Sequence, residues 1–113
     1  MSRTANSYQA HARSTAVYPG QHTFDGLNYT ILGLVGEAGE MANKLKKIIR
    51  DKDSVLSPVD RLDLATELGD VAWYLANAAT ELGYQLSTIL EANINKLEDR
   101  AKRGVLQGSG DVR

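Results

Sequence analysis

Apolar residues recur at intervals of three and four through most of this chain, which is the pattern of amphipathic helices. The spacing predicts four helices, over residues 4–17, 25–50, 58 to about 82, and 85–103. Proline and glycine directly after Tyr18 end the first helix, and Ser57 followed by Pro58 provides an N-cap and a first residue for the third. No segment alternates as a strand would. The sequence therefore predicts an all-α fold, a four-helix bundle.

Helices two to four each carry an apolar stripe, and we expect these stripes to form the core of the bundle. The predicted core positions are Leu27, Ile31, Leu34, Val35, Ala38, Met41, Ala42, Leu45, Ile49, Leu64, Leu68, Val71, Leu75, Ala78, Leu82, Leu86, Ile89, Leu90, Ile94 and Leu97.

Two acidic pairs stand beside these stripes at matched helical spacing. Glu37 and Glu40 lie three residues apart on the second helix, as do Glu67 and Asp70 on the third. Residues three apart share one helix face, so the four carboxylates meet if the two helices pack antiparallel. Two carboxylates ~4 Å apart repel by about 4 kcal/mol at an effective dielectric of ~20. Such a cluster needs protons or a cation, and oxygen ligands suit Mg²⁺. The alternative is that all four acids are solvated surface residues.

Glycines interrupt the same two helices close to the acids. Gly33, Gly36 and Gly39 lie at three-residue intervals in the second helix, and Gly69 lies between the acids of the third. Each interior glycine costs roughly 1 kcal/mol of stability relative to alanine. A sequence tolerates this loss where two backbones approach closely or where a ligand does. The glycines alone do not distinguish these two explanations.

Two lysines and two aromatic residues extend the polar faces of these helices. Lys44 and Lys47 follow the first acidic pair and could contact a metal–phosphate complex, although Lys44 could equally pair with Glu40 on the surface. Trp73 and Tyr74 follow the second pair and could stack on a nucleobase, although aromatic residues in a helix are more often core.

Four further residues on helices three and four complete the candidates for ligand contact. Asn77 is predicted to be a partly buried amide beside the acids, placed to complete metal coordination or to contact a sugar or base edge. Asn93, Lys96 and Arg100 lie on one face of the last helix, in a stripe that Arg103 extends. If this face meets the acidic site, its cations would neutralise a polyphosphate. Alternatively, a basic last turn simply complements the helix dipole.

Composition narrows the class of protein. The 113 residues suit one domain, over 1–113, and a net charge of −1 gives no indication of nucleic-acid binding. The absence of cysteine excludes disulfides, thiolate metal sites and cysteine nucleophiles. No apolar run approaches membrane-spanning length and the N-terminus has no apolar signal core, so we expect a soluble, cytoplasmic protein without a membrane partner. Residues 104–113 are glycine-rich and are predicted to form a flexible tail.

Three segments together resemble the motif blocks of the MazG-type all-α nucleotide pyrophosphohydrolases, relatives of the dimeric dUTPases. They read GLVGEAGEMANKLKK, ELGDVAWYLANAATELG and ANINKLEDR. The two acidic pairs match the family pattern without substitution, and Lys96, Leu97 and Arg100 match the K-L-x-x-R of the last block. The resemblance covers about residues 8–103, which is the expected core of the domain.

The resemblance implies a helical bundle that assembles as a homodimer or homotetramer. It also implies hydrolysis of a nucleoside triphosphate, commonly a deoxynucleotide, to the monophosphate and pyrophosphate, in a role that cleans the nucleotide pool. Mg²⁺, or Mn²⁺ in its place, would be held by the four acids, one of which could accept a proton from water. The candidates for contact with substrate are Lys96, Asn93, Arg100, Lys44, Asn77, Trp73, Tyr74 and Lys47.

The residues that flank Glu37 in the first acidic pair differ from those in some relatives. Those relatives carry an additional acid there as a proposed base, whereas this chain has Gly36 and Ala38. A mechanism that needs a fifth carboxylate is therefore not supported. The alternative function is a catalytically silent regulator that binds a nucleotide or metal on the same helical scaffold, and a purely structural helical oligomer is the remaining possibility.

Overall fold

Four α-helices make up the computed structural model, which describes residues 3–113. They are α1 (Ala5–Ser14), α2 (Phe24–Asp51), α3 (Pro58–Leu82) and α4 (Leu86–Arg103). The described residues contain no β-strand. The all-α class and the four helices are thus confirmed, with boundaries within three residues of those predicted. The first two residues of the domain predicted over 1–113 lie outside the described part of the chain.

Local capping explains where α3 begins and ends. The Ser57 hydroxyl accepts a hydrogen bond from the Asp60 amide at 3.1 Å, and the Asp60 carboxylate accepts one from the Ser57 amide at 3.4 Å, which is a capping box. Gly83 ends α3 with a φ of 80°, a left-handed conformation that glycine adopts without strain. Helix α2 begins at Phe24, with Thr23 as its N-cap, one residue earlier than the pattern predicts.

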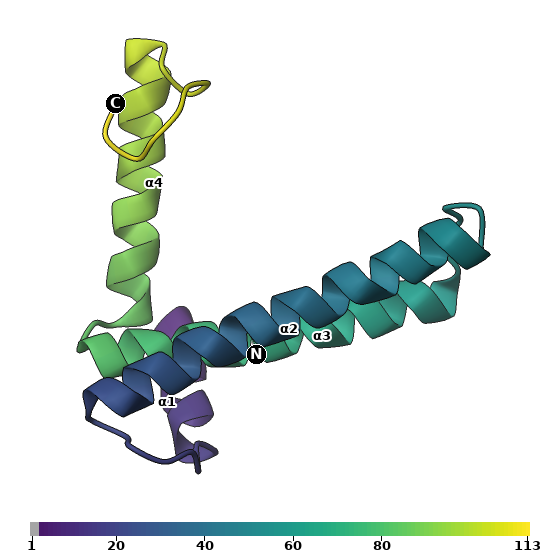
Figure 1. Cartoon of the computed structure of the whole chain (residues 1–113). Helices are drawn as coiled ribbons and strands as arrows, with labels where there is room; N and C mark the ends of the chain where they lie inside the picture. Colours follow the sequence, from purple (N-terminus) through teal and green to yellow (C-terminus); the bar gives the residue numbers. More distant parts are fainter. Residues whose placement is uncertain (1–2) are drawn as a thin grey trace.

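Helices α2 and α3 lie side by side as a long antiparallel pair, and α1 packs against the C-terminal half of α3 (Figure 1). The small buried core sits where α1, α3 and the start of α4 meet. It consists of Ala12, Ala76, Ala79 and Leu86, flanked by Ala5, Tyr8, Trp73 and Ile89. This core fixes the end of α3 that lies beyond the acidic pairs.

A buried carboxylate ties α1 and the following loop to α3. The Glu81 side chain is 0% exposed and forms an ion pair with Arg13 at 2.7 Å. Oε1 of Glu81 accepts a hydrogen bond from the His22 amide at 2.8 Å, and the Tyr18 hydroxyl donates to Oε2, the oxygen that pairs with Arg13. Burial raises the pKa of a carboxyl group, but these hydrogen bonds outweigh burial and hold the pKa of Glu81 below its ordinary value. Glu81 therefore stays ionised and anchors three segments.

Helix α4 projects away from the α2–α3 pair (Figure 1). Among the described helices it contacts α1 and α3 but not α2. The expected bundle is therefore open within one chain, because α4 leaves the other helices after its first turns. Many predicted core residues are consequently exposed in the single chain. These are Ile31, Val35, Leu45, Ile49, Leu68, Leu75, Leu82, Leu90, Ile94 and Leu97.

Gly33 is the one glycine of the acidic region that a close approach requires. A Cβ atom at this position would lie 2.1 Å from Cε1 of the Tyr74 ring, which packs directly on the α2 backbone. Gly36, Gly39 and Gly69 have no such neighbour within 4 Å. Close helix packing therefore explains Gly33, and nothing in the single chain explains the other three.

Replacing Gly33 with alanine is expected to destabilise the protein by about 1–3 kcal/mol, because the Tyr74 ring must shift to admit a methyl group. Gly39→Ala is the matched control. Its methyl group meets open space, so better helix propensity should add up to about 1 kcal/mol. Urea denaturation followed by circular dichroism measures both. Equal effects of the two substitutions would contradict the packing of Tyr74 on Gly33.

Candidate active site

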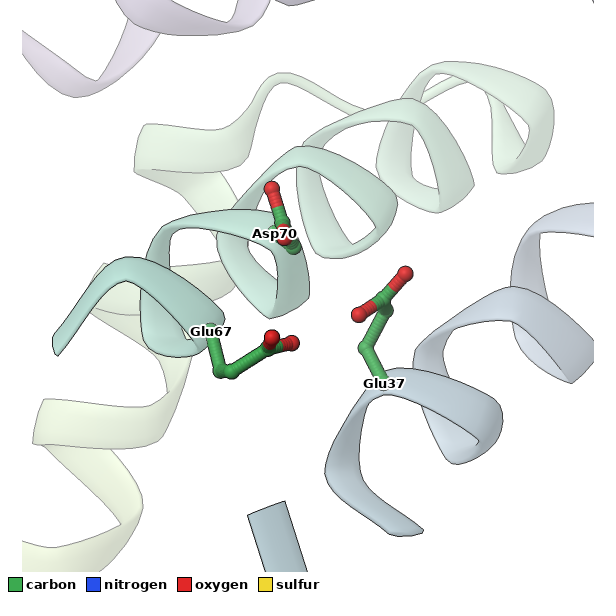
Figure 2. A group of neighbouring side chains, drawn as sticks. All are labelled: Glu37, Glu67 and Asp70. Atoms are coloured by element: carbon green, nitrogen blue, oxygen red, sulfur yellow. The ribbon is translucent and has the colours of Figure 1, made fainter. Parts of the chain in front are cut away.

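Three carboxylates from α2 and α3 converge between the two helices (Figure 2). Glu37 extends from α2, Glu67 extends toward it from α3, and Asp70 lies close by on α3. One oxygen from each lies within 4.8 Å of the others. The antiparallel packing of α2 and α3 is what brings the acids together, as the spacing of the two pairs predicts.

Two oxygens of this group are buried without a hydrogen-bond partner among the described residues. They are Oε2 of Glu37 and Oε2 of Glu67. A buried carboxylate oxygen that accepts no hydrogen bond costs free energy, and a bound cation would remove that cost. Carboxylate oxygens are also the ligands that hard divalent ions prefer. Glu37, Glu67 and Asp70 therefore fit a divalent metal ion on both geometry and chemistry.

The electrostatics of the cluster agree with this fit. Burial is the largest cause that raises the pKa of Glu37 to about 7, followed by the neighbouring Glu67 carboxyl and the charges of Glu40 and Asp70. Lys44 acts in the opposite direction on Glu67. Its ammonium donates to Glu67 at 2.9 Å and to Asp63 at 2.7 Å, and it holds the pKa of Glu67 below the ordinary value. One lysine thus offsets part of the negative charge, and Glu37 remains the acid most disfavoured in its charged form.

The raised pKa of Glu37 should make the metal-free protein less stable as pH rises, because the carboxyl group then loses its proton. The folded pKa of about 7 lies above the ordinary 4.5, so this stabilisation is complete below about pH 4.5 and is lost as pH rises through 7. In EDTA, we expect the free energy of unfolding to fall between about pH 5 and pH 8, and millimolar Mg²⁺ to remove most of that fall. Urea denaturation at a series of pH values measures it.

Glu37→Gln is the variant that isolates this effect, because the amide cannot titrate. Its stability in EDTA should be nearly flat over the same pH window, whereas Glu98→Gln, at an exposed position of α4, should keep the slope of the unmodified protein. A slope that survives in Glu37→Gln would assign the pH dependence to another group.

Glu40 stands apart from the three converging acids. Its side chain is exposed, and it does not belong to the group of oxygens within 4.8 Å. Its charge nevertheless contributes to the raised pKa of Glu37, which places it close to the cluster. A fourth ligand from Glu40 stays a prediction.

A hollow of about 310 Å³ adjoins the cluster, lined by Glu37, Asp70, Trp73 and Tyr74. The two aromatic rings meet edge to face with centroids 5.0 Å apart. The Trp73 indole N–H donates to the Thr15 hydroxyl at 2.8 Å, so α1 helps to orient this ring. The hollow therefore has carboxylates on one side and aromatic surface on the other.

Sequence reasoning missed three residues that contact the aromatic rings or Lys44. Tyr18 stacks on Tyr29 with ring centroids 5.0 Å apart, and its ring also meets Trp73 edge to face at 6.3 Å. Tyr29 precedes Gly33 and Glu37 at intervals of four residues, so the same helical stripe could have revealed it. Asp63, the second partner of Lys44, likewise precedes Glu67 by four residues.

Several predicted ligand-binding residues make contacts other than those expected. Asn77 is wrong as a partly buried amide, because its side chain is fully buried and donates to the backbone oxygens of Ala12 and Trp73 at 3.4 and 3.2 Å. Lys44 pairs with α3 and not with Glu40. Lys47 lines a separate hollow of about 290 Å³ among charged residues near the α2–α3 connection.

The basic face of α4 does not meet the acidic cluster within one chain, because α4 projects away from α2. Asn93 and Lys96 instead line a hollow of about 480 Å³ beside the end of α3, and Lys96 and Arg100 pair with Asp111 of the tail. Within one chain this face therefore supplies no cation to the acidic cluster, and contact of Asn93, Lys96 and Arg100 with substrate stays a prediction.

Comparison with known proteins assigns the family. Residues 26–105 match the MazG nucleotide pyrophosphohydrolase domain, which is well over half of the chain. The protein belongs to the MazG family, whose members are generally dependent on a divalent metal. Membership indicates a nucleotide pyrophosphohydrolase and a nucleotide substrate.

A curated relative extends over nearly the whole chain. The sequence is 55% identical over 109 residues to the Gene 37 protein of Mycobacterium phage L5, covering 94% of this chain and 96% of the relative. The relative's name states no activity. No solved structure gives a significant match to the chain. Across residues 3–113, none of the helices has both the length and the apolar character needed to cross a membrane.

Proposed function

We propose that this protein hydrolyses a nucleoside or deoxynucleoside triphosphate to the monophosphate and pyrophosphate, and so cleans the nucleotide pool. Mg²⁺ is the proposed metal, with Mn²⁺ as a substitute. The observation that carries the proposal is the pair of buried, unpartnered oxygens of Glu37 and Glu67, which lie beside a hollow with aromatic walls. The metal-bound phosphates and the nucleobase of one nucleotide could then bind side by side.

Each group of residues takes a separate part in the proposed reaction. When bound, Mg²⁺ supplies charge neutralisation on the phosphate oxygens and helps to orient the attacking water. Glu37, Glu40, Glu67 and Asp70 hold the metal, and one of these carboxylates accepts a proton from the water. Trp73 and Tyr74 offer aromatic surface to the nucleobase. Lys44 keeps Glu67 ionised and in position through its 2.9 Å hydrogen bond.

We assign the phosphate contacts of Asn93, Lys96 and Arg100 to α4 of a second copy of the chain, within a homodimer or homotetramer. Two observations support a second copy. Within a chain α4 makes no contact with α2, and the apolar residues Leu90 and Ile94 on α4 are exposed. Covering this stripe would stabilise the protein through burial of apolar surface.

Light scattering after size exclusion tests the assembly. We expect a mass of two or four times the 12.3 kDa of one chain. Ile94→Glu should shift the mass toward that of a single chain, because a charge would enter the buried stripe. Asn95→Glu, at the next exposed position of α4, is the matched control and should not. A folded, monomeric unmodified protein at micromolar concentration would contradict the assembly.

Product analysis on a panel of ribo- and deoxynucleoside triphosphates tests the reaction. We expect release of pyrophosphate rather than orthophosphate, with Mg²⁺ or Mn²⁺ and not with EDTA. Binding of nucleotides without turnover of any of them would instead favour a catalytically silent regulator. Orthophosphate as the first product would contradict the proposed bond cleavage.

A further inference from the structure

The segment after α4 turns back and lies along that helix (Figure 1). Gly104 ends α4 in a left-handed conformation with a φ of 73°. Oδ1 of Asp111 then accepts hydrogen bonds from the Lys96 ammonium at 2.6 Å and from Arg100 at 3.2 Å. The Asp111 backbone oxygen also accepts from Arg100. The tail thus places one carboxylate on two cations of the basic face of α4.

Arg100 is unusual because its charged side chain is only 6% exposed. A guanidinium group that has lost most of its water needs an anion as a partner. Asp111 supplies that anion from a side chain that is 78% exposed. The cation pair is therefore built into the helix, whereas its partner comes from a segment without helix or strand.

A phosphate group offers the same chemistry as the Asp111 carboxylate. Arginine binds phosphate through paired N–H donors, and lysine binds it as a point charge. Lys96 also lines the hollow of about 480 Å³, together with apolar residues such as Leu82 and Ile89. A phosphate at Lys96 would therefore have room beside it for the remainder of a ligand.

We propose that Asp111 occupies, in the free protein, the Lys96–Arg100 pair that must bind substrate phosphate, so that the tail competes with the nucleotide. This inference rests on the proposed function for the identity of the competing ligand. The tail carries Gly108 and Gly110, and the latter has a φ of 80°. Glycines at these positions allow the segment to swing away while the rest of the chain keeps its fold.

Competition from a tethered group raises the apparent Kd of the free ligand by a constant factor. Water and salt screen the exposed Asp111 carboxylate, so its two ion pairs are weak, and we expect them to weaken phosphate binding by roughly 3- to 10-fold. Because Asp111 is exposed and outside the helices, its substitution leaves the fold of α1 to α4 unaltered.

Calorimetric titration with inorganic tripolyphosphate at low ionic strength tests the inference without any turnover. Asp111→Asn should bind tripolyphosphate roughly 3- to 10-fold more tightly than the unmodified chain. Glu98→Gln, which removes an exposed carboxylate of α4 outside the pair, should bind unchanged. Adding Lys96→Ala to Asp111→Asn should abolish the gain.

Unchanged or weaker binding by Asp111→Asn would overturn the inference, and so would a lack of binding by every variant. A different result would contradict the proposed function: no release of pyrophosphate from any nucleotide by the unmodified protein. If the protein is active but Asp111→Asn gains no affinity for tripolyphosphate, only the role of the tail is wrong.

Discussion

Replacing Glu67 with glutamine is expected to reduce pyrophosphate release by about 100-fold or more, since even loss of a residue that supports a metal ligand costs 10–100-fold. Glu67 contributes one of three converging oxygens and carries a second, buried oxygen without a partner. Glutamine keeps the size of the side chain but removes the charge that the metal requires. Steady-state rates at saturating Mg²⁺ and nucleotide measure the effect.

Glu98→Gln provides the control for this substitution, because it removes an exposed glutamate of α4 away from the cluster. Its rate should equal that of the unmodified protein. Glu67→Gln should remain folded, since no buried charge is left without a partner: Lys44 keeps its 2.7 Å hydrogen bond to Asp63. Full activity of Glu67→Gln would show that the cluster is not the site of the reaction.

Glu81→Ala is expected to cost about 3–5 kcal/mol of folding stability, the loss typical of removing one partner from a buried ion pair. The substitution leaves Arg13 without its carboxylate and removes the acceptor of the Tyr18 hydroxyl and the His22 amide. Because small domains have about 5–15 kcal/mol in total, this is a large fraction of the whole. Urea denaturation in the presence of Mg²⁺ measures it.

Two control substitutions show whether the loss of stability in Glu81→Ala comes from the buried carboxylate. Glu81→Gln keeps an oxygen acceptor, so it should cost less, about 1–3 kcal/mol. Glu91→Ala removes an exposed glutamate of α4 and should change stability by no more than about 0.5 kcal/mol. If Glu81→Ala behaved like Glu91→Ala, the buried network would not anchor α1.

The helices could be predicted because their signals are local. Ser57 with Pro58 and the glycine at position 83 mark the ends of α3, and each acts within one turn of the backbone. The same holds for the acids, since spacing by three residues fixes a shared face whatever surrounds the helix. The convergence of Glu37 with Glu67 and Asp70 then required only that α2 and α3 pack antiparallel.

The direction of α4 could not be predicted, because a stripe shows which face is apolar and not what covers it. Leu90 and Ile94 satisfy the pattern of a core helix, yet they are exposed in one chain. For the same reason, the sequence leaves open whether the basic face of α4 meets the acidic site. Its contacts with Asp111 depend on how a glycine-rich tail turns, which hydrophobic periodicity does not encode. Flexibility of that tail stays a prediction.

Asn77 and Gly33 show the same limit at the level of single residues. The spacing places Asn77 one turn beyond Tyr74 on the polar stripe. However, α1 covers this part of α3, and the Asn77 amide donates a hydrogen bond to the backbone oxygen of Ala12. Gly33 was open to two explanations, and the contact with Tyr74 selects close packing. Both outcomes depend on residues distant in sequence.

The most direct test of the account is the binding of Mn²⁺, followed by electron paramagnetic resonance, in the unmodified protein and in Glu37→Gln and Glu67→Gln. The account predicts saturable Mn²⁺ binding that Mg²⁺ displaces and that each substitution weakens by about tenfold or more. Equal affinity for Mn²⁺ in all three proteins would contradict a metal site between α2 and α3.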